Sequence, residues 1–525
     1  MQKAYDAVVI GAGHNGLATA IHLAKRGWSV GVFEAKSEAG GAVKTRELTL
    51  PGFRHDVAAM NLSMFAGSPF LREYGEALGR HGLAFAPAED CFASVFPDRT
   101  WFGISKTLDK TLARLTAINA NDAQSFTRLL EKFGGDAPHI FGLLGNVMPS
   151  LAAFKVVWSA WRQNGTAWTY EMLRFLFSSP RAWLDQNFES PKVKATLGAW
   201  GMHLDFAPDV SGGALFPYLE TMTNQAFGMV IGKSGADTMI KAMVGYLQEF
   251  GGEVHLNAPV KEVTSSAGSA DGILLSSGEH IAARKAVVAN VTPPVLFGSL
   301  LPNGSGQEDV DAKFKNFRPG PGTMMLHLAL KAPLKWNAGQ ELSNFAYVHV
   351  APTYDYMTLA YSEAMAGLLP QAPVLVVGQP TAIDASRAPE GKHIAWVQVR
   401  VLPKHVEGDA AGKITSTDWQ KIKDAYADRV VDLIESYASG TRKNILARAV
   451  FSPDDLESEN ACLIGGDNLS GSHHLDQNFI FRPVAGYSRY KLPMKRLYMC
   501  GAATWPGAGT GAGSGYLLGK MLGGK

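Results

Sequence analysis

The sequence predicts an α/β fold in which a discontinuous Rossmann-like domain is interleaved with an α+β domain. Three segments predict it. An apolar run at residues 7–10 leads into a GxGxxG motif and a helical pattern. Residues 228–302 show a helical pattern followed by strand patterns, and residues 495–522 join an apolar run to a glycine-rich helix start. Strands that alternate with helices in this way indicate a parallel sheet.

The composition excludes several classes of protein. Of 525 residues, 46% are apolar and 18% are charged, which allows large cores and disfavours a disordered chain. The net charge of +2, with scattered lysine and arginine, indicates no nucleic-acid partner. The three cysteines, Cys91, Cys462 and Cys500, form neither a CxxC pair nor a ligand cluster, so we expect no metal site and no dithiol chemistry.

The first strand and helix predict a phosphate-binding turn between them. Gly11 allows the tight turn, Gly13 lets the backbone approach a diphosphate, and Gly16 lets the helix pack against the strand. We expect the helix over residues 17–26, with its N-terminal amides directed at the diphosphate.

The second strand is expected over residues 28–33, and it ends at Glu34. A carboxylate in this position accepts hydrogen bonds from ribose hydroxyls and repels a 2′-phosphate, so it disfavours NADP. Because the strand, helix, second strand and acidic residue occur in the expected order, the match is more specific than a GxGxxG alone.

A second glycine pair, Gly40-Gly41, distinguishes the two remaining dinucleotides. The segment resembles the extended motif of flavoproteins, in which this loop runs along the diphosphate and ribityl chain. Simple NAD dehydrogenases lack it, and no second GxGxxG occurs in the chain. We therefore expect FAD and no separate nicotinamide domain.

The middle and C-terminal segments complete the predicted cofactor domain. A helix is expected to end at Gly251-Gly252, followed by hairpin strands with turns at Asp271-Gly272 and Ser277-Gly278. Residues 497–500 predict a strand, and residues 511–522 predict a glycine-rich helix start and an apolar helix.

These segments divide the chain into two predicted domains. The cofactor domain is assigned residues 1–75, 228–305 and 460–525. The substrate domain is assigned residues 76–227 and 306–459, and its segment 105–225 is expected to be largely helical.

Residues 137–154 are the most apolar stretch, but glycines and Pro149 interrupt it, so a membrane span is not expected. Residues 141–161 and 175–177 leave three alternatives open: buried helices, a hydrophobic substrate tunnel, or a surface that docks on a membrane. The early first strand leaves no room for a signal peptide. We therefore expect a cytoplasmic protein, with peripheral membrane contact as the alternative.

Two motifs carry a resemblance to a known family: GAGHNGL at residues 11–17 and the long segment from HHLDQ to PGAGTGAG at residues 473–513. The chain resembles the phytoene desaturase-like flavoproteins, and within them the phytoene dehydrogenase-related group. The resemblance covers both ends and the middle segment, and it is weak over residues 105–225 and 330–455. It implies an FAD-binding domain of the glutathione-reductase/amine-oxidase type.

The resemblance also implies where FAD binds. The two glycine motifs and Glu34 would hold the ADP half, Val260 would present its backbone to the adenine, and residues 55–61 would run beside the isoalloxazine ring. The C-terminal segment would hold the ribityl chain and the pyrimidine end of the ring. The implied cofactor-binding residues are Gly11, Gly13, His14, Asn15, Gly16, Glu34, Ala35, Gly40, Gly41, Ala42, Val43, Ala58, Ala59, Met60, Asn61, Val260, Gly501, Ala502, Gly511, Ala512 and Gly513.

Departures from the family pattern bear on the reaction. Many relatives have arginine where this chain has Ala42. Amine oxidases of this architecture present an aromatic residue over the flavin, whereas residues 509–511 here are small and Trp505 is the nearest large ring. They also tend to carry a lysine near flavin N5, and residues 323–330 contain none. These departures disfavour amine oxidation.

A bound flavin supplies the redox chemistry. We expect hydride transfer to flavin N5 and proton loss from the adjacent carbon, which is a desaturation of an apolar or cyclic substrate. His327, on the strand at the flavin face, is the candidate base, and a core histidine is the alternative. Trp505 and Tyr487 either line the pocket or pack structurally.

Two other functions stay open: a flavin amine oxidase, and a redox-neutral FAD-dependent isomerase or interaction protein. The expected electron acceptor is oxygen or a quinone. The sequence predicts neither the particular substrate nor the oligomeric state.

Overall fold

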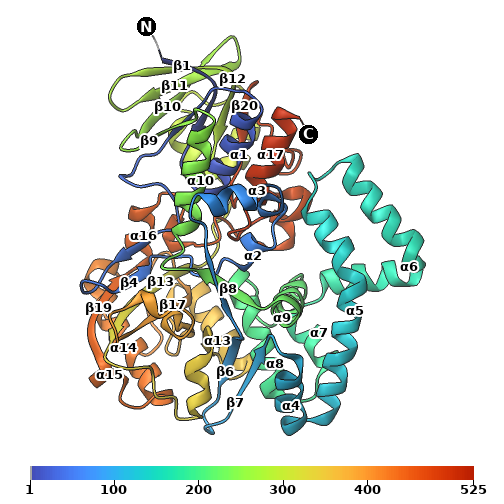
Figure 1. Cartoon of the computed structure of the whole chain (residues 1–525), viewed down its shortest axis with the longest axis vertical. Helices are drawn as coiled ribbons and strands as arrows, with labels where there is room; N and C mark the ends of the chain where they lie inside the picture. The colour runs from blue at the N-terminus through green and yellow to red at the C-terminus, as the bar shows by residue number, and fades with distance from the viewer. Residues whose placement is uncertain (1–2, 525) are drawn as a thin grey trace.

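A computed structural model describes residues 3–524 and contains two seven-stranded sheets. In Figure 1 the first sheet lies at the top and the second at the lower left. β1 is the central strand of the first sheet and pairs in parallel with β2 and β12, which suits its buried apolar residues. The strand order is β10 (Val260–Ser266), β11 (Ser269–Leu275), β12 (His280–Ala289), β1 (Lys3–Ile10), β2 (Val30–Phe33) and β9 (Glu253–His255), with β20 (Leu497–Met499) also pairing with β12.

Helices α1 (His14–Lys25), α10 (Thr238–Glu249) and α17 (Gly513–Gly523) pack together beside this sheet. α1 starts three residues before the predicted position, because Gly13 is its N-cap. α1 and α17 approach so closely that a Cβ on Gly515 would lie 1.8 Å from the Asn15 carbonyl oxygen. The backbones of the N-terminal and C-terminal helices are therefore in direct contact.

One predicted turn is wrong. Asp271-Gly272 lies inside β11, and the hairpin between β10 and β11 turns at Ala267-Gly268 instead. A Cβ on Gly272 would lie 2.2 Å from the Ile281 carbonyl oxygen, so this glycine serves a close approach between strands. The turn at Ser277-Gly278 is present.

The second sheet is formed by residues from the middle of the chain. Its order is β19 (Ile445–Phe451), β13 (Gly322–Leu330), β17 (His393–Leu402), β16 (Val374–Gly378), β14 (Tyr347–Val350), β6 (Asp90–Val95) and β7 (Trp101–Ser105). One face is aliphatic and packs against α14 (Trp419–Tyr437) through residues such as Val397 and Val399. The opposite face is directed toward the helical segment and carries polar and aromatic side chains.

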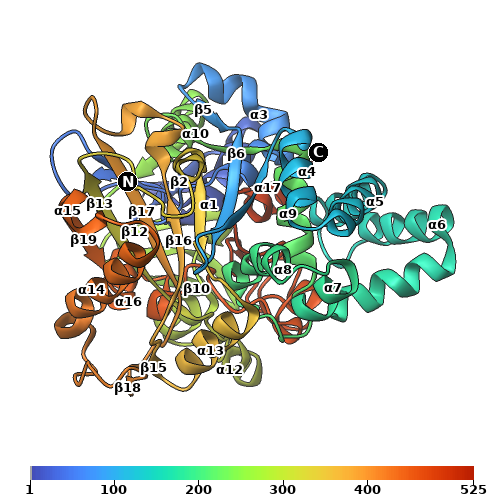
Figure 2. The ribbon, with the colours of Figure 1, turned by 90° about the horizontal axis from the view of Figure 1, so that it is seen from below.

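The helical segment comprises α4 (Leu108–Ile118), α5 (Ala120–Leu144), α6 (Leu151–Phe177), α7 (Pro180–Asn187), α8 (Pro191–Gly198), the 3-10 helix η1 (Ala199–Leu204) and α9 (Leu215–Phe227). α5 and α6 extend away from the body as a hairpin, as both ribbon views show (Figure 1, Figure 2). The preceding residues contain β5 (Phe85–Ala88), which pairs with β8 (Met229–Gly232) in a separate two-stranded sheet, and β6 and β7, which complete the edge of the second sheet.

Smaller elements connect the two sheets. They include β3 (Thr45–Glu47), β4 (Arg54–Asp56), β8 (Met229–Gly232), α2 (Ser63–Ala66), α3 (Pro69–Arg80), α12 (Glu308–Lys315), α13 (Tyr354–Met365), α15 (Thr441–Asn444) and α16 (Pro453–Glu459). The predicted α/β class with interleaved sheets is confirmed, whereas the exact domain boundaries stay a prediction. Among residues 3–524, no helix has the length and apolarity needed to cross a bilayer.

Candidate cofactor and substrate site

The glycine motif forms a tight turn between β1 and α1. Gly11 has a φ of +91° and donates its N–H to the Phe33 carbonyl over 2.8 Å. A Cβ on Gly16 would lie 2.5 Å from the Gly11 carbonyl oxygen and 2.8 Å from Asn290 Nδ2. The turn is therefore filled on its inner side, while Gly13 and His14 keep accessible surface on the outer side. This geometry fits a diphosphate at the start of α1.

Glu34 is held rigidly at the end of β2. Its carboxylate accepts the Ala12 N–H over 2.8 Å and the Lys36 N–H over 3.0 Å. Its backbone carbonyl accepts the Ala258 N–H, which brings the chain leading to Val260 beside it. A fixed, partly accessible carboxylate next to the glycine turn fits ribose hydroxyls, and the neighbouring Val260 backbone fits the adenine.

The Gly40-Gly41 loop closes over the first turn. Gly40 donates its N–H to the Ala12 carbonyl over 3.0 Å, and a Cβ on Gly41 would lie 3.4 Å from the Gly13 Cα. We call the five glycines Gly11, Gly13, Gly16, Gly40 and Gly41 the glycine cradle.

Residues 42–44 lead from the cradle toward the predicted flavin loop. Ala59 donates its N–H to the Ala42 carbonyl, and Val57 donates its N–H to the Lys44 carbonyl. Loop 55–61, which contains Ala58, Ala59, Met60 and Asn61, thereby starts beside Val43.

The C-terminal glycine segment meets the same loop. Thr510 Oγ1 donates to the Asn61 carbonyl over 3.2 Å, and the His14 ring lies 3.2 Å from the Gly509 carbonyl oxygen. His14 keeps some accessible surface, but the surrounding chain encloses it. This burial lowers the pKa of His14 to about 4, so the ring is neutral. Segments 11–16, 40–43, 58–61 and 509–513 therefore lie along one continuous path, as an extended dinucleotide requires.

Several residues that position this path were missed by the sequence reasoning. Asn290, which follows β12, donates to the Gly11 carbonyl over 3.3 Å. Arg482 is fully buried and donates to the Ala502 carbonyl, and His473 Nε2 accepts the Ala508 N–H. Ser514 accepts the Gly501 N–H. Of these residues, only Asn290 has a signal in the sequence, because it directly follows an apolar strand.

The two candidate pocket residues lie in different environments. Trp505 is buried and donates its indole N–H to the Asn146 carbonyl after α5, so it joins the α5–α6 turn to the cofactor domain. Tyr487 packs edge-on against Phe314 on the other side of the first sheet, away from loop 55–61. Their assignment to a substrate pocket stays a prediction.

His327 lies on β13 and is fully buried, with ring contacts to His55 and Phe451. Neither ring nitrogen has a hydrogen-bond partner by strict geometry, although the Val57 backbone lies near enough to interact. Burial holds the pKa of His327 well below its usual value, so it is neutral. The structure places it beside the flavin loop, and its role as the base stays a prediction.

Polar and aromatic side chains gather on the face of the second sheet opposite α14. We call Tyr347, His349, Trp396, Gln398 and Arg400 the substrate face. The Tyr347 and Trp396 rings stack with centroids 5.8 Å apart. Gly378 pairs with both residues in the sheet, and a Cβ there would lie 3.0 Å from the Trp396 ring and 3.1 Å from Met60 Cε of the flavin loop. This face therefore adjoins the predicted flavin position.

Two further titratable groups come from the helical segment. His203 of η1 places its Nε2 3.0 Å from His349 Nε2, and burial lowers the pKa of His349 to about 3, so both rings are neutral. Burial raises the pKa of Glu220 on α9 to about 7, and its carboxylate interacts electrostatically with Tyr347. No local pattern singles out Glu220, because the residues that follow it in α9 include two threonines, an asparagine and a glutamine.

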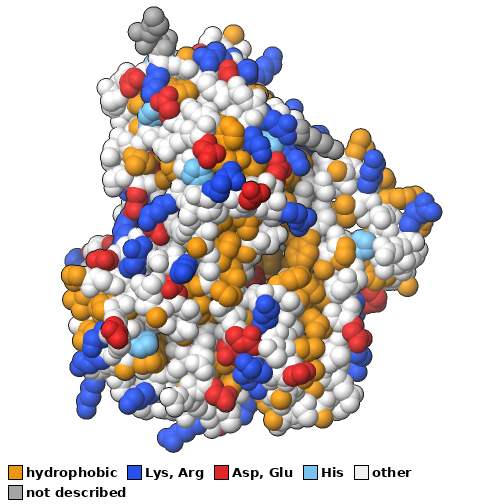
Figure 3. Space-filling model, viewed as in Figure 1, with side chains coloured by type: hydrophobic (Ala, Val, Ile, Leu, Met, Phe, Trp, Pro, Cys, Tyr) orange, Lys and Arg blue, Asp and Glu red, His pale blue; other side chains and the backbone are white. Residues whose placement is uncertain are grey.

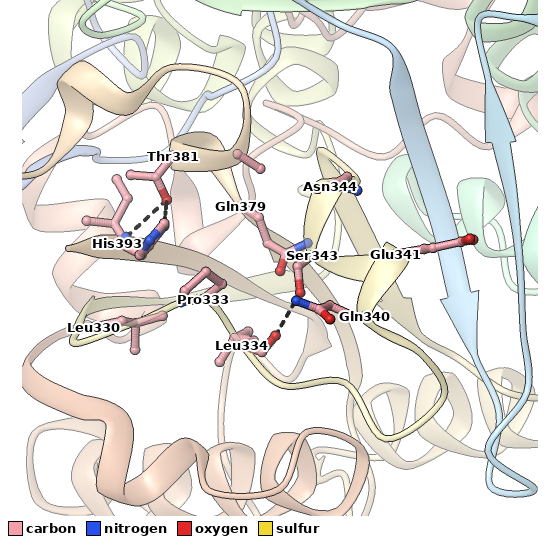
Figure 4. A pocket seen from close by; sticks show the side chains of 12 residues that line it. Leu330, Pro333, Leu334, Gln340, Glu341, Ser343, Asn344, Gln379, Thr381 and His393 are labelled. Carbon is pink, nitrogen blue, oxygen red and sulfur yellow. Dashed lines mark hydrogen bonds between the residues drawn. The ribbon is translucent and has the colours of Figure 1, made fainter. Parts of the chain in front are cut away.

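The molecular surface is hollowed between the cofactor domain and α9, and hydrophobic side chains line the hollow (Figure 3). A separate pocket of about 460 Å³ lies at one end of β13 and β17, where Leu330 pairs with His393. Arg400 lies near the other end of these two strands. Two of its polar residues have partners. Gln379 bonds with Trp336, Leu342 and Phe345, and His393 bonds with Thr381, the pair joined by a dashed line in Figure 4.

The arrangement of a glycine cradle, a flavin loop and a substrate sheet agrees with comparisons to known proteins. The family model described as "Flavin containing amine oxidoreductase" matches residues 16–507. The chain belongs to this family. It is accordingly an FAD-dependent oxidoreductase, and the cradle, Glu34 and loop 55–61 are the parts that fit the cofactor.

Relatives that match the chain over most of its length include proteins named as a dehydrogenase and a desaturase. The chain is 28% identical to pyridine nucleotide-disulfide oxidoreductase domain-containing protein 2 of Rattus norvegicus, over 97% of this chain and 91% of the relative. It is 24% identical to a limonene dehydrogenase component of Castellaniella defragrans (99% and 94% covered) and to phytoene desaturase of Fusarium fujikuroi (96% and 86% covered).

Solved structures share the fold. An oxidoreductase from Methanosarcina mazei superimposes with a TM-score of 0.64 at 16% identity, covering 98% of this chain and 99% of the other. Putrescine oxidase bound to putrescine superimposes with a TM-score of 0.57 at 14% identity, covering 100% and 99%. At these identities the likeness concerns the fold alone.

Proposed function

We propose that this flavoprotein is a desaturase or dehydrogenase that removes hydrogen from adjacent carbons of a substrate with a large apolar or cyclic body. The observation that carries the proposal is the stacked Tyr347–Trp396 pair beside Met60 of the flavin loop. Flat aromatic walls with few charges suit hydrocarbon. The names of two relatives, a limonene dehydrogenase component and a phytoene desaturase, support the same class.

The reaction would remove one hydride and one proton and leave a carbon–carbon double bond. FAD, when bound, takes up the hydride, and an external acceptor, oxygen or a quinone, then reoxidises the cofactor. The residues of the chain hold the reacting carbons at about 3–3.5 Å from the cofactor and exclude water.

A proton acceptor is needed on the substrate face. Glu220 of α9 interacts electrostatically with Tyr347, and a pKa of about 7 suits proton exchange at physiological pH. We assign this role to Glu220 ahead of His327, because both nitrogens of His327 are enclosed.

Anaerobic flavin reduction tests the proposal. The purified holoprotein is mixed with apolar and cyclic candidate substrates without oxygen, and bleaching is followed at roughly 450 nm, the usual oxidised-flavin band. Bleaching by such a substrate, with an alkene product identified by mass spectrometry, supports desaturation. Bleaching by amines alone, with aldehyde and peroxide on admission of oxygen, would establish amine oxidation instead.

The α5–α6 hairpin bears on the predicted membrane contact. Its exposed side chains include Leu151 (81% exposed), Phe154 (61%), Trp158 (50%) and Phe177 (62%). These exposed fractions contradict the alternative of buried helices, and Figure 2 shows α6 extending from the body. Peripheral membrane contact by this hairpin stays a proposal, which flotation of the holoprotein with phospholipid vesicles would test.

A further inference from the structure

Among residues 3–524 three arginines lie almost completely inside the protein, and one of them has no ionic partner and a single hydrogen-bond partner. Arg387 is fully buried and pairs with Asp56 over 2.9 Å. Arg482 is fully buried and donates to the carbonyls of Ser470, Gly471, Ser472 and Ala502. Arg400 is 7% exposed, yet its only hydrogen bond runs from Nη1 to Asn468 Oδ1 over 3.0 Å.

The remaining nitrogens of Arg400 are unused. Nε is buried without a partner, and Nη2 makes no hydrogen bond but keeps accessible surface. No carboxylate among residues 3–524 lies within 4.0 Å of this guanidinium. The nearest acidic group, Asp467, already accepts the N–H groups of Gly320, Leu469 and Gly471.

Burial lowers the pKa of Arg400 only to about 10, so the guanidinium stays charged near neutral pH. An enclosed cation with a single neutral partner is costly, because its lost hydration is not replaced. Proteins retain such a group where an anion binds, and a guanidinium matches a carboxylate with two parallel hydrogen bonds.

Other polar groups near Arg400 also lack partners. The Tyr347 hydroxyl and the Gln398 side-chain amide form no hydrogen bond, and both keep accessible surface although their residues are buried. Tyr347 also interacts electrostatically with Arg400. The His203–His349 pair is neutral and therefore does not neutralise the guanidinium. Donors without partners therefore occur along this face, and Arg400 is the charged group among them.

The strand geometry sets the distance between this polar end and the flavin. Trp396 pairs with Gly378, which contacts Met60, and Arg400 lies four residues farther along β17, on the same face. At roughly 3.3 Å per residue, the two positions are about 13 Å apart. A substrate that reaches from Arg400 to the flavin loop therefore needs an apolar body of about this length.

We propose that Arg400, assisted by Asn468, binds the carboxylate of an amphipathic substrate whose apolar body lies along Tyr347 and Trp396 toward the flavin. The substrate class is an apolar or cyclic carboxylic acid. This inference rests on the proposed function, and it separates this chain from enzymes whose substrates are hydrocarbons without an acidic group.

Ligand binding to the holoprotein tests the proposal independently of turnover. Oleate and abietate serve as linear and ring-shaped acids, and methyl oleate and oleyl alcohol as neutral analogues. Binding is followed by quenching of tryptophan fluorescence and by the change in flavin absorbance. We expect at least one acid to bind ten-fold or more tightly than its neutral analogue. Equal binding of acid and neutral analogue, or no binding of either acid, would overturn the proposal.

Variants then locate the anchor. Arg400→Gln should reduce acid affinity at least ten-fold, to the level of the neutral analogue, and Arg400→Lys should restore part of it. The control is Arg128→Gln, an exposed arginine on α5 that should leave affinity unchanged. Unchanged acid affinity in Arg400→Gln contradicts the proposal. If Arg400→Gln does not fold, the wild-type comparison of acid and neutral analogue decides alone.

The two proposals fail separately. If acids bind through Arg400 but no substrate ever bleaches the flavin, the acid anchor stands and the proposed desaturation fails. If neutral hydrocarbons bleach the flavin and acids neither bind nor react, the desaturation stands and the acid anchor fails.

Discussion

The glycine cradle and the substrate face lie side by side and are built by different means. The cradle uses backbone atoms: N–H groups, carbonyls, and positions where a Cβ would meet another backbone, as at Gly16. The substrate face uses side chains from strands β14 and β17, supplemented by η1 and α9. The cradle fits the cofactor that the family shares, whereas the substrate face can accommodate a different ligand when its side chains change, without a change of fold.

The largest effect on cofactor binding is expected in the cradle. In Gly16→Ala the new Cβ meets the Gly11 carbonyl 2.5 Å away and cannot be accommodated without moving β1 or α1. We expect FAD affinity to fall at least about 100-fold, which is about 2.7 kcal/mol. Fluorescence titration of the apoprotein with FAD measures it. Gly79→Ala, on α3 with open space around it, is the control, and equal FAD affinity in both variants would refute the argument.

The second prediction contrasts two buried arginines. Arg387→Gln removes the partner of buried Asp56, and such losses cost about 3–5 kcal/mol of unfolding free energy. Arg400→Gln removes a charge without an ionic partner, so we expect no loss of stability or a gain. Urea denaturation of the two variants measures the difference. A large destabilisation by Arg400→Gln would mean that Arg400 has a structural partner after all.

The third prediction concerns pH. Burial raises the Glu220 pKa from 4.5 to about 7, so the folded protein holds this proton more tightly than the unfolded chain does. The stabilisation from this proton is complete below pH 4.5 and is lost as pH rises through 7. Glu220→Gln should therefore gain up to about 3 kcal/mol over wild type at pH 8 relative to pH 4.5. Denaturation at both pH values tests this, and a difference that does not depend on pH would disprove the shift.

The smallest effect is expected at Glu34. Glu34→Ala removes a carboxylate that accepts two backbone N–H groups and fits the ribose, so we expect FAD affinity to fall about 10-fold, or 1.4 kcal/mol. The same FAD titration applies. Glu76→Ala, whose side chain is 95% exposed, should leave the affinity unchanged. If Glu34→Ala also leaves it unchanged, Glu34 does not contact the cofactor.

The same contrast explains what the sequence could predict. The cradle follows from short-range spacing, because Gly11, Gly13, Gly16 and Glu34 belong to one strand–helix–strand unit whose geometry is local. Fold class and cofactor were predicted correctly for this reason. The turn predicted at Asp271-Gly272 was wrong because the glycine there serves a neighbouring strand, which a local pattern does not show.

The substrate face could not be predicted in the same way. Tyr347 and Arg400 are brought together only by the pairing of β14, β16 and β17, and each looks ordinary in its own segment. His327 was singled out because a histidine in an apolar strand is conspicuous. Arg400 in VQVRVL was overlooked, because an arginine in an alternating strand usually faces solvent.

The contact between α1 and α17 has a consequence for biosynthesis. The Gly515 amide donates to the Asn15 side chain, and these two residues are 500 positions apart. At a translation rate of about 5–20 residues per second, the first helix waits roughly 25–100 s for its partner. During this interval the nascent chain lacks one wall of the cofactor site. A chain that stops before Gly513 lacks α17 and therefore that wall, so we expect it to capture FAD poorly.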